Sequence, residues 1–316
     1  MFIGVDVGGS NMSAGLFDLN RNLVETAKVK SKAKEYTETI IGQLIKVIDK
    51  LILNIPSDSQ LKAIGIGVAG LIDGKTSTVT VSGNLNINGV NFKEILGKHY
   101  DLPVCIENDV NVGVLGEWKH GGGKGHENVV GIFVGTGIGG GLVLNNRLYT
   151  GAGGMAGEIG HIVVSKGGVY CTGCGTQGCL EAHAGKVGLE DRIRNISQKH
   201  IQSTLIDLVN GNNGKLKSSF IKTALDDGDA VAHELIEEAM DYLAVGIAST
   251  INMLNPSVVV LGGGVMEAVG QPYLDRIKRT VQNNSYEPIF RKCEYKLAEL
   301  GDNSGIFGAM ELVVDL

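Results

Sequence analysis

The feature that most constrains this fold is a glycine-rich segment that occurs twice in the chain. Residues 9–16 (GSNMSAGL) and residues 135–142 (GTGIGGGL) begin with glycine and end in Gly-Leu, with Ser opposite Thr and Met opposite Ile between them. In each copy, a polar turn containing Asn and Arg separates this segment from a second apolar stretch. Short apolar stretches on both sides of a polar turn are typical of a β-hairpin. The sequence therefore predicts two related hairpins.

A helix and a buried strand follow each hairpin, so the repeated unit extends beyond the glycines. Apolar residues recur with helical spacing over residues 36–53 and again over residues 232–255. Each predicted helix precedes an apolar strand that runs into glycines, at residues 63–70 and residues 258–264, and we expect the latter to end in a glycine turn. Two copies of hairpin, helix and strand predict a duplicated α/β protein with a ligand cleft between its halves.

The glycines also match a dinucleotide-binding pattern, but their context differs from that motif. Gly135, Gly137 and Gly140 fit G-x-G-x-x-G, which binds pyrophosphate only where its last glycine opens a helix. An apolar strand follows here instead, and a second match at residues 65–70 is also followed by a strand pattern. A nicotinamide enzyme is therefore disfavoured. The N–H groups of a hairpin turn can still bind phosphate, although such glycines can also serve the turn alone.

Composition and charge disfavour several functional classes. Apolar residues make up 43% and charged residues 20% of the 316 residues, which is ordinary for a globular protein with room for two domains. The net charge of −6 disfavours a nucleic-acid groove. No apolar run reaches the roughly 20 residues of a membrane span, and the N-terminus does not resemble a signal peptide. Clustered cysteines are typical of metal sites in reducing compartments, so we expect a cytoplasmic protein.

The strongest local signal is a group of three cysteines. Cys171, Cys174 and Cys179 lie among glycines, and His161 precedes the first of them by ten residues. Three sulfurs and one imidazole nitrogen form a common ligand set for tetrahedral zinc. Four protein ligands leave no open position for water, so the sequence predicts a structural zinc site.

Polar residues at the ends of predicted elements are candidates for chemistry. Asn108 and Asp109 end an apolar strand, where a carboxylate could accept the proton of an alcohol that attacks phosphorus. The alternative role for Asp109 is to cap a helix that begins near Val110. Glu158 and Glu181 flank the cysteine loop, where they could accept hydrogen bonds from sugar hydroxyl groups or could be solvated turn residues.

Seven motifs span nearly the whole chain in a defined order. They read DVGGSN, END, GTGIGGG, GEIGH, CGTQGCLE, NPSVVVLGGG and DNSGIFGA. Together they resemble the ROK family of sugar kinases, and more narrowly its bacterial glucokinase branch. The resemblance implies an actin-like ATPase (ribonuclease H-like) fold, with two domains that close over sugar and ATP. We expect a small domain of residues 1–117 and 302–316, and a larger domain of residues 118–301.

The resemblance also implies roles for individual residues. Asp109 would be the general base for the sugar's 6-hydroxyl, and Asp6 would help to position Mg²⁺. Contacts to the sugar are implied for Gly70, Asn84, Asn108, Asp109, Glu158, His161 and Glu181. Contacts to ATP are implied for Gly9, Ser10, Gly135, Thr136, Gly137, Gly262, Gly263 and Gly264. The zinc ligands would be His161, Cys171, Cys174 and Cys179.

Two segments depart from the family's usual pattern. The first two cysteines are usually spaced C-x-C, whereas Cys171-Thr172-Gly173-Cys174 has one residue more, which leaves the role of Cys171 open. Glucokinases tend to have a Pro-Asn-Leu-Gly-Trp run where this chain reads SGNLNINGVNF, so Asn84 and Leu85 match but the Pro and Trp do not. We expect glucose as the substrate, with N-acetylmannosamine as the runner-up and fructose or allose as further alternatives.

Other functions within the same family stay open. Some members are sugar-responsive repressors, which carry a helix-turn-helix domain before the first strand and often lack the catalytic aspartate. Met1 lies one residue before the first predicted strand and Asp109 is present, so we expect an enzyme, with a non-catalytic sugar sensor as the alternative. The expected partners are a sugar and ATP, without nucleic acid or membrane, and the family implies a homodimer.

Overall fold

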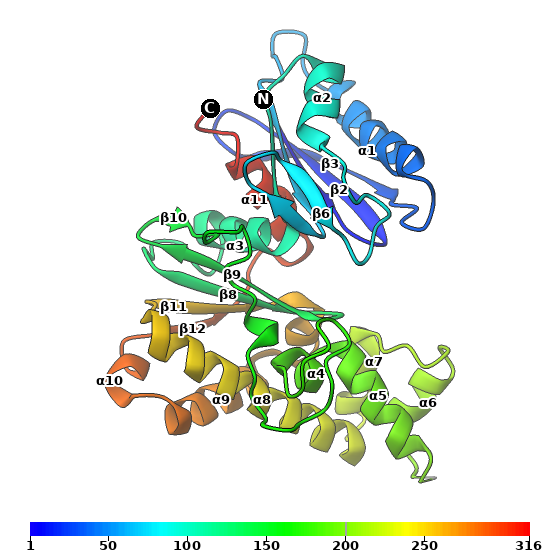
Figure 1. Cartoon of the computed structure of the whole chain (residues 1–316), viewed down its shortest axis with the longest axis vertical. Helices are drawn as coiled ribbons and strands as arrows, with labels where there is room; N and C mark the ends of the chain where they lie inside the picture. The colour runs from blue at the N-terminus through cyan, green and yellow to red at the C-terminus, as the bar shows by residue number, and fades with distance from the viewer. Residues whose placement is uncertain (200) are drawn as a thin grey trace. The chain divides into compact units, whose positions relative to one another are not determined.

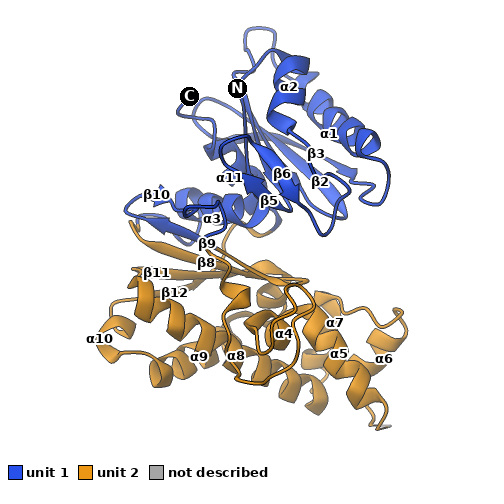
Figure 2. Cartoon of the chain, in the orientation of Figure 1, with its two compact units in different colours: residues 1–125, 141–156, 302–316 blue, residues 126–140, 157–301 orange. Residues whose placement is uncertain are grey.

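The structure is a computed structural model that describes residues 1–199 and 201–316. Contacts within the chain divide it into two compact units (Figure 2). Unit 1 comprises residues 1–125, 141–156 and 302–316, and unit 2 comprises residues 126–140 and 157–301. The expected domains, residues 1–117 with 302–316 and residues 118–301, stay a prediction.

Unit 1 is built on a five-stranded sheet in the order β3-β2-β1-β4-β7. Figure 1 labels β2 and β3 of this sheet. The strands are β1 (Phe2–Val7), β2 (Asn11–Phe17), β3 (Leu23–Lys30), β4 (Ala63–Val68) and β7 (Val104–Asn108). The first three pair antiparallel as the predicted hairpin, whereas β4 is parallel to β1 and β7 is parallel to β4. A small hairpin of β5 (Leu71–Asp73) and β6 (Thr78–Val81) follows β4.

Helices cover both faces of this sheet. Helix α1 (Thr37–Ile52) and helix α2 (Phe92–Tyr100) share one apolar core with Ile3, Val5 and Val7 of β1. On the opposite face, α11 (Ser304–Glu311) packs against Phe2 and also contacts α3 (Asp109–His120). Alternate residues of a strand face opposite sides, so Asp6 lies on the face that α11 covers.

The second sheet repeats the strand order of the first, as β10-β9-β8-β11-β12. Its strands are β8 (Val129–Val134), β9 (Ile138–Leu144), β10 (Arg147–Leu148), β11 (Val258–Gly262) and β12 (Glu294–Leu297). Asn145 and Asn146 both have positive φ, 53° and 60°, as a two-residue hairpin turn between β9 and β10 requires. The matching strand orders confirm the predicted duplicated α/β fold.

Most of the remaining helices lie in unit 2. They are η1 (Ile159–His161), α4 (Leu180–Ala184), α5 (Lys186–Ser197), α6 (Thr204–Asn210), α7 (Ser218–Asp226), α8 (Ala230–Leu254), α9 (Gly263–Asn284) and α10 (Glu287–Phe290); η2 (Gly301–Asn303) precedes α11. Helix α8 confirms the predicted long helix and ends at Leu254, followed by the capping residue Asn255, whose backbone is left-handed. Among the described residues, no helix is both long and apolar enough to cross a membrane.

The glycines after β11 form a different structure from the expected turn. Helix α9 begins at Gly263, directly after the strand, instead of after a separate glycine turn. The physical reason is the backbone of Gly263, which has a φ of +84° and would place a Cβ atom within 2.6 Å of the Val134 carbonyl oxygen. Only glycine fits this close, left-handed junction between strand and helix.

Candidate functional site

In unit 1, the junction between β7 and α3 positions Asn108 and Asp109. The Asn108 side chain caps α3, because its Oδ1 accepts hydrogen bonds from the backbone N–H groups of Val110 (2.9 Å) and Asn111 (3.1 Å). Its Nδ2 donates to the carbonyl oxygen of Gly70 and to Oδ1 of Asp109, both at 3.0 Å. The capping role considered for Asp109 therefore belongs to Asn108. Three of the predicted sugar contacts, Gly70, Asn108 and Asp109, are brought together here.

Asp6 at the end of β1 lies in an acidic environment. Burial, together with the negative charges of Asp109 and Asp302, raises the pKa of Asp6 to about 7. Gly305 at the start of α11 packs directly on this side chain, since an added Cβ atom would lie 2.9 Å from Asp6 Cγ. Carboxylates held together in this way favour a bound cation, which would restore their ionised state. Asp302 was not singled out from the sequence, although it begins the DNSGIFGA motif.

The turn between β1 and β2 holds two further predicted residues, Gly9 and Ser10. A Cβ atom added to Gly9 would lie 3.3 Å from Cβ of Asn84, so the absence of a side chain lets the two segments approach closely. Ser10 and Asn84 are both exposed. The predicted ATP residue Gly9 and the predicted sugar residue Asn84 thus lie side by side within unit 1.

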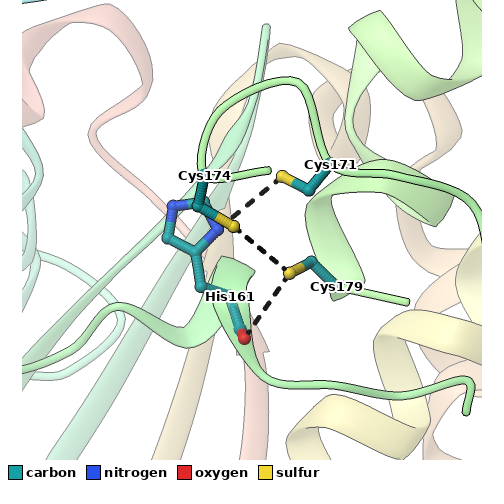
Figure 3. Close-up of side chains that lie close together, drawn as sticks. All are labelled: His161, Cys171, Cys174 and Cys179. Carbon is teal, nitrogen blue, oxygen red and sulfur yellow. Dashed lines mark hydrogen bonds between the residues drawn. The ribbon is translucent and has the colours of Figure 1, made fainter. Parts of the chain in front are cut away.

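In unit 2, His161, Cys171, Cys174 and Cys179 converge (Figure 3). One ligand atom from each of them lies within 4.8 Å of all the others. The Sγ atoms of Cys174 and Cys179 are 3.5 Å apart, and Cys171 Sγ is 3.8 Å from Nδ1 of His161. Zn–S bonds of about 2.3 Å in a tetrahedron separate ligand atoms by about 3.8 Å, so the donor set and its dimensions fit zinc.

The extra residue between the first two cysteines does not remove Cys171 from the cluster. The loop closes on itself, because the Cys171 N–H donates to Thr176 and the Cys171 carbonyl oxygen accepts from Gly175. Hydrogen bonds from Thr176 lower the pKa of the exposed Cys174 thiol to about 7, whereas burial raises the pKa of Cys179 to about 12. The cluster thus contains one thiol that ionises readily and buried thiols that require a cation to do so.

The two ring nitrogens of His161 face different partners. One faces the cysteine cluster, and the other faces Glu158. Its Nδ1 lies near Cys171, and its Nε2 is 3.9 Å from a carboxylate oxygen of the half-exposed Glu158. A histidine ligand commonly pairs its second nitrogen with a carboxylate, which orients the ring. Glu158, His161 and Cys171 therefore form a continuous series of contacts.

The glycine turn between β8 and β9 is held by the start of α5. The carbonyl oxygens of Gly135 and Thr136 accept hydrogen bonds from the N–H groups of Lys186 and Val187, both at 3.1 Å. The Gly135 N–H donates back to the Gly137 carbonyl oxygen at 2.9 Å. Thr136 is exposed at the tip of this turn, as expected of a residue that contacts a ligand.

Glu181 lies between the glycine turn and the cysteine cluster. Its Oε2 accepts a hydrogen bond from the Ile138 N–H at 2.9 Å, and its Oε1 is 3.5 Å from Cys171 Sγ. Sequence reasoning placed Glu181 on the sugar and missed both contacts. The available signal was the pair of glycines at positions 137 and 173, where an added Cβ atom would lie within 2.6 Å of the Glu181 carboxylate.

The remaining predicted ATP residues, Gly262, Gly263 and Gly264, connect β11 to α9. An added Cβ atom at Gly264 would lie 2.6 Å from Oγ of Ser218, at the start of α7. The first N–H groups of a helix have no partner within the helix and attract anions. This junction therefore presents a second group of backbone donors in unit 2.

Comparisons with known proteins agree on one family. A family model described as "ROK family" matches residues 2–315. The glucokinase of Streptomyces coelicolor is 33% identical over 319 residues, covering 98% of this chain and 96% of that protein. The solved ROK family glucokinase from Streptomyces griseus, in complex with glucose and AMPPNP, has a TM-score of 0.82 at 31% identity and covers 98% of each chain. The xylose repressor of Bacillus subtilis is 30% identical, covering 99% of this chain and 77% of that protein.

Proposed function

This chain belongs to the ROK family, and we propose that it is an ATP-dependent kinase that phosphorylates the 6-hydroxyl group of glucose. The likeness to glucokinases over nearly the full length of both chains supports a sugar kinase activity. The observation that carries the proposal is the arrangement of Asn108 and Asp109, in which a carboxylate directly follows strand β7 and is held by hydrogen bonds.

Asp109 is the proposed general base. Its Oδ1 accepts hydrogen bonds from Nδ2 of Asn108 and from the Val110 N–H, each at 3.0 Å, so its carboxylate is oriented before a substrate binds. An oriented carboxylate within hydrogen-bond distance of a sugar hydroxyl can accept its proton as the oxygen attacks the γ-phosphorus. Asn108 acts as the positioning residue, because it links Asp109 to Gly70 and to the first turn of α3.

The proposed Mg²⁺ site is formed by Asp6 and its acidic neighbours. Mg²⁺ prefers carboxylate, water and phosphate oxygens, and ATP supplies the phosphates. When bound, the cation neutralises charge that develops on the transferred phosphoryl group. The raised pKa of Asp6, to about 7, supports this assignment, since burial is its main cause and the negative charges of Asp109 and Asp302 add to it.

Contacts to ATP are proposed for the two glycine-rich backbone segments of unit 2 and, separately, for the β1–β2 turn of unit 1. The turn at Gly135, Thr136 and Gly137 would contact phosphate oxygens, because its glycines allow close approach and its Thr136 hydroxyl is accessible. Gly9 and Ser10 would occupy the equivalent position in unit 1. The junction at residues 262–264 would contact the nucleotide through the start of α9.

Zinc is proposed to bind His161 and the three cysteines. Its role would be structural, since four protein ligands leave no position for a reacting group. Through His161 it would orient Glu158, and both residues are proposed to contact sugar hydroxyl groups together with Glu181.

Glucose is proposed ahead of N-acetylmannosamine because two of the three asparagines that could bind an N-acetyl group already form hydrogen bonds within the chain. A buried N-acetyl amide requires polar partners, and Asn84, Asn86 and Asn88 are the candidates. Asn88 already accepts a hydrogen bond from the Ser82 N–H at 2.7 Å, and Asn86 donates to the Glu35 carbonyl oxygen at 3.4 Å. Two of the three side chains are thus engaged within unit 1.

The second candidate function is a sugar-responsive regulator, which the likeness to xylose repressors supports. A coupled assay for ADP release, over a panel of hexoses and N-acetylhexosamines, separates the two. The kinase proposal expects ADP release that depends on a hexose and that is lost in an Asp109→Asn variant which still binds sugar. Sugar binding by calorimetry without ADP release from any sugar would favour the regulator and overturn the kinase.

A further inference from the structure

We propose that Glu181 is a positioning residue that ties the glycine turn at Gly135–Ile138 to the cysteine cluster, so that the cluster sets the affinity for the nucleotide. The inference rests on the proposed function, because it takes this turn to be part of the ATP site. It differs from the sugar contact implied for Glu181, since the atoms involved are a backbone N–H and a thiol of the chain itself.

The two oxygens of the Glu181 carboxylate have different partners. Oε2 accepts the Ile138 N–H at 2.9 Å, and Oε1 lies 3.5 Å from Sγ of Cys171. Oε2 is fixed by the Ile138 N–H, and Oε1 packs against the loop that carries Cys171 and Gly173, so the position of this one carboxylate depends on both segments. A displacement of Cys171 is therefore transmitted to the backbone at the first residue of β9.

Glycines on both sides make room for this carboxylate. An added Cβ atom would lie 2.1 Å from Oε2 at Gly137 and 2.6 Å from Oε1 at Gly173. The first glycine belongs to the turn, and the second belongs to the loop between Cys171 and Cys174. Neither glycine has a positive φ, so close approach of Glu181 is what requires the absence of a side chain.

The segment that begins at Glu181 contacts the glycine turn at a second point. Residues Lys186 and Val187 donate their N–H groups to the carbonyl oxygens of Gly135 and Thr136, and the Gly185 N–H donates to the Glu181 carbonyl oxygen at 2.9 Å. The segment from Glu181 to Val187 therefore binds the turn through both its carbonyl oxygens and the Ile138 N–H. Without the Glu181 contact, the turn would keep only the hydrogen bonds that its Gly135 and Thr136 carbonyl oxygens accept.

The test compares Glu181→Ala with Glu181→Gln. Glutamine keeps a carbonyl oxygen that can accept the Ile138 N–H, whereas alanine removes the acceptor. Hydrogen exchange should be at least about tenfold faster at the Ile138 amide in the alanine variant and near wild type in the glutamine variant. The Kd for AMPPNP, measured by calorimetry, should rise about tenfold in the alanine variant, equivalent to about 1.4 kcal/mol, and about twofold or less in the glutamine variant.

A second pair of variants tests the link to the cluster. Gly173→Ala places a methyl group against Oε1 and should accelerate exchange at Ile138, although residue 173 does not touch the turn. Thr172→Ala, at the exposed neighbouring position, is the matched control and should leave exchange unchanged. Removal of metal with a chelator, verified by elemental analysis, should also accelerate hydrogen exchange at the Ile138 amide.

The outcomes separate this inference from the proposed function. If wild-type protein binds no nucleotide, the kinase proposal fails. If wild type binds nucleotide but Glu181→Ala leaves Ile138 exchange and the nucleotide Kd unchanged, the inference is overturned while the kinase survives. Equal loss of glucose affinity in both Glu181 variants, with no change at Ile138, would assign the residue to the sugar alone.

Discussion

At the scale of single residues, the chemistry of this protein depends on how each carboxylate is held. Asp109 is oriented by Asn108 and by the first turn of α3. Asp6 instead carries a raised pKa, because burial and neighbouring carboxylates disfavour its charged form. We therefore propose that the same chemical group accepts a proton at one position and binds a cation at the other.

Replacement of the base tests the first of these roles. We expect Asp109→Asn to lower kcat by about 10²–10⁴-fold, because it keeps the shape of the side chain but removes the proton acceptor. Sugar affinity, measured by calorimetry, should stay within about threefold of wild type. Asp58→Asn, at an exposed position, serves as the control. Loss of sugar binding with a residual rate near that of wild type would contradict the assignment.

The raised pKa of Asp6 predicts how stability depends on pH. In the folded state Asp6 keeps its proton up to about pH 7, whereas in the unfolded state it ionises near its ordinary value of 3.8. Between these values the folded protein binds more protons than the unfolded one, so this group lowers stability as pH rises, and the loss is complete above pH 7. Asp6→Asn should therefore raise the free energy of unfolding more at pH 8, by about 2–4 kcal/mol, than at pH 5.

Urea titrations of the metal-free and nucleotide-free protein at the two pH values provide the measurement. Addition of Mg²⁺ should stabilise wild type at pH 8 and leave the Asp6→Asn variant nearly unchanged. An equal gain at both pH values would show that the stabilisation does not arise from the titration of Asp6.

At the scale of elements, two structures position candidate residues: the cysteine loop within unit 2 and the helix α11 within unit 1. The loop brings together ligands that lie 18 residues apart at most, between His161 and Cys179. Helix α11 instead packs a C-terminal segment against β1 and β4 at the opposite end of the chain. The first arrangement is local in sequence, and the second is not.

The cysteine loop predicts one zinc ion per chain. Chelation should lower Tm by at least about 5 °C, because a ligand that binds only the folded loop stabilises it by mass action. Cys171→Ser and Cys179→Ser should cost more stability than Cys174→Ser, since Cys171 and Cys179 are buried and Cys174 is exposed. Elemental analysis and thermal melts provide the measurements. Metal-free protein with unchanged Tm and full activity would count against the site.

The packing of α11 predicts a contrast between two glycines. A Cβ atom added to Gly65 of β4 would lie 1.7 Å from the Ala309 carbonyl oxygen, so Gly65→Ala must separate the helix from the sheet. We expect a loss of about 2–4 kcal/mol in the free energy of unfolding. Gly42→Ala in α1 is the matched control, because nothing lies within 4 Å of its added Cβ atom. That control should gain about 0.5–1 kcal/mol from helix propensity.

At the scale of the whole molecule, two sheets share one strand order, and each sheet has a glycine turn that is a candidate for ligand binding. The β1–β2 turn in unit 1 and the β8–β9 turn in unit 2 occupy equivalent places in that order. The duplication therefore offers paired glycine turns, while Asp6, Asp109 and Asp302 lie in unit 1 and the cysteine cluster lies in unit 2. The repeated scaffold thus carries different candidate residues in its two copies.

Substrate preference is a property of the whole chain. We expect kcat/KM for glucose to exceed that for N-acetylmannosamine by at least about tenfold, which corresponds to about 1.4 kcal/mol in transition-state binding. The physical reason is that Asn86 and Asn88 each already use part of their hydrogen-bonding capacity within unit 1, which leaves fewer groups for an N-acetyl amide. The coupled ADP assay measures both constants. A higher value for N-acetylmannosamine would reverse the substrate assignment and leave the kinase chemistry intact.

The sequence by itself determined the repeated hairpins, the long helix α8, the strand at residues 258–262 and the grouping of His161 with three cysteines. These features follow from local spacing, because helices and strands have different apolar periods and a short loop keeps its ligands near one another. Only the tertiary structure decided that Asn108 caps α3, that Asp6 lies near Asp109 and Asp302, and that Glu181 contacts Ile138. Each of these depends on which distant strands and loops lie side by side, as when β4 separates β1 from β7 in the sheet. No local pattern encodes such neighbours, since long-range packing selects them.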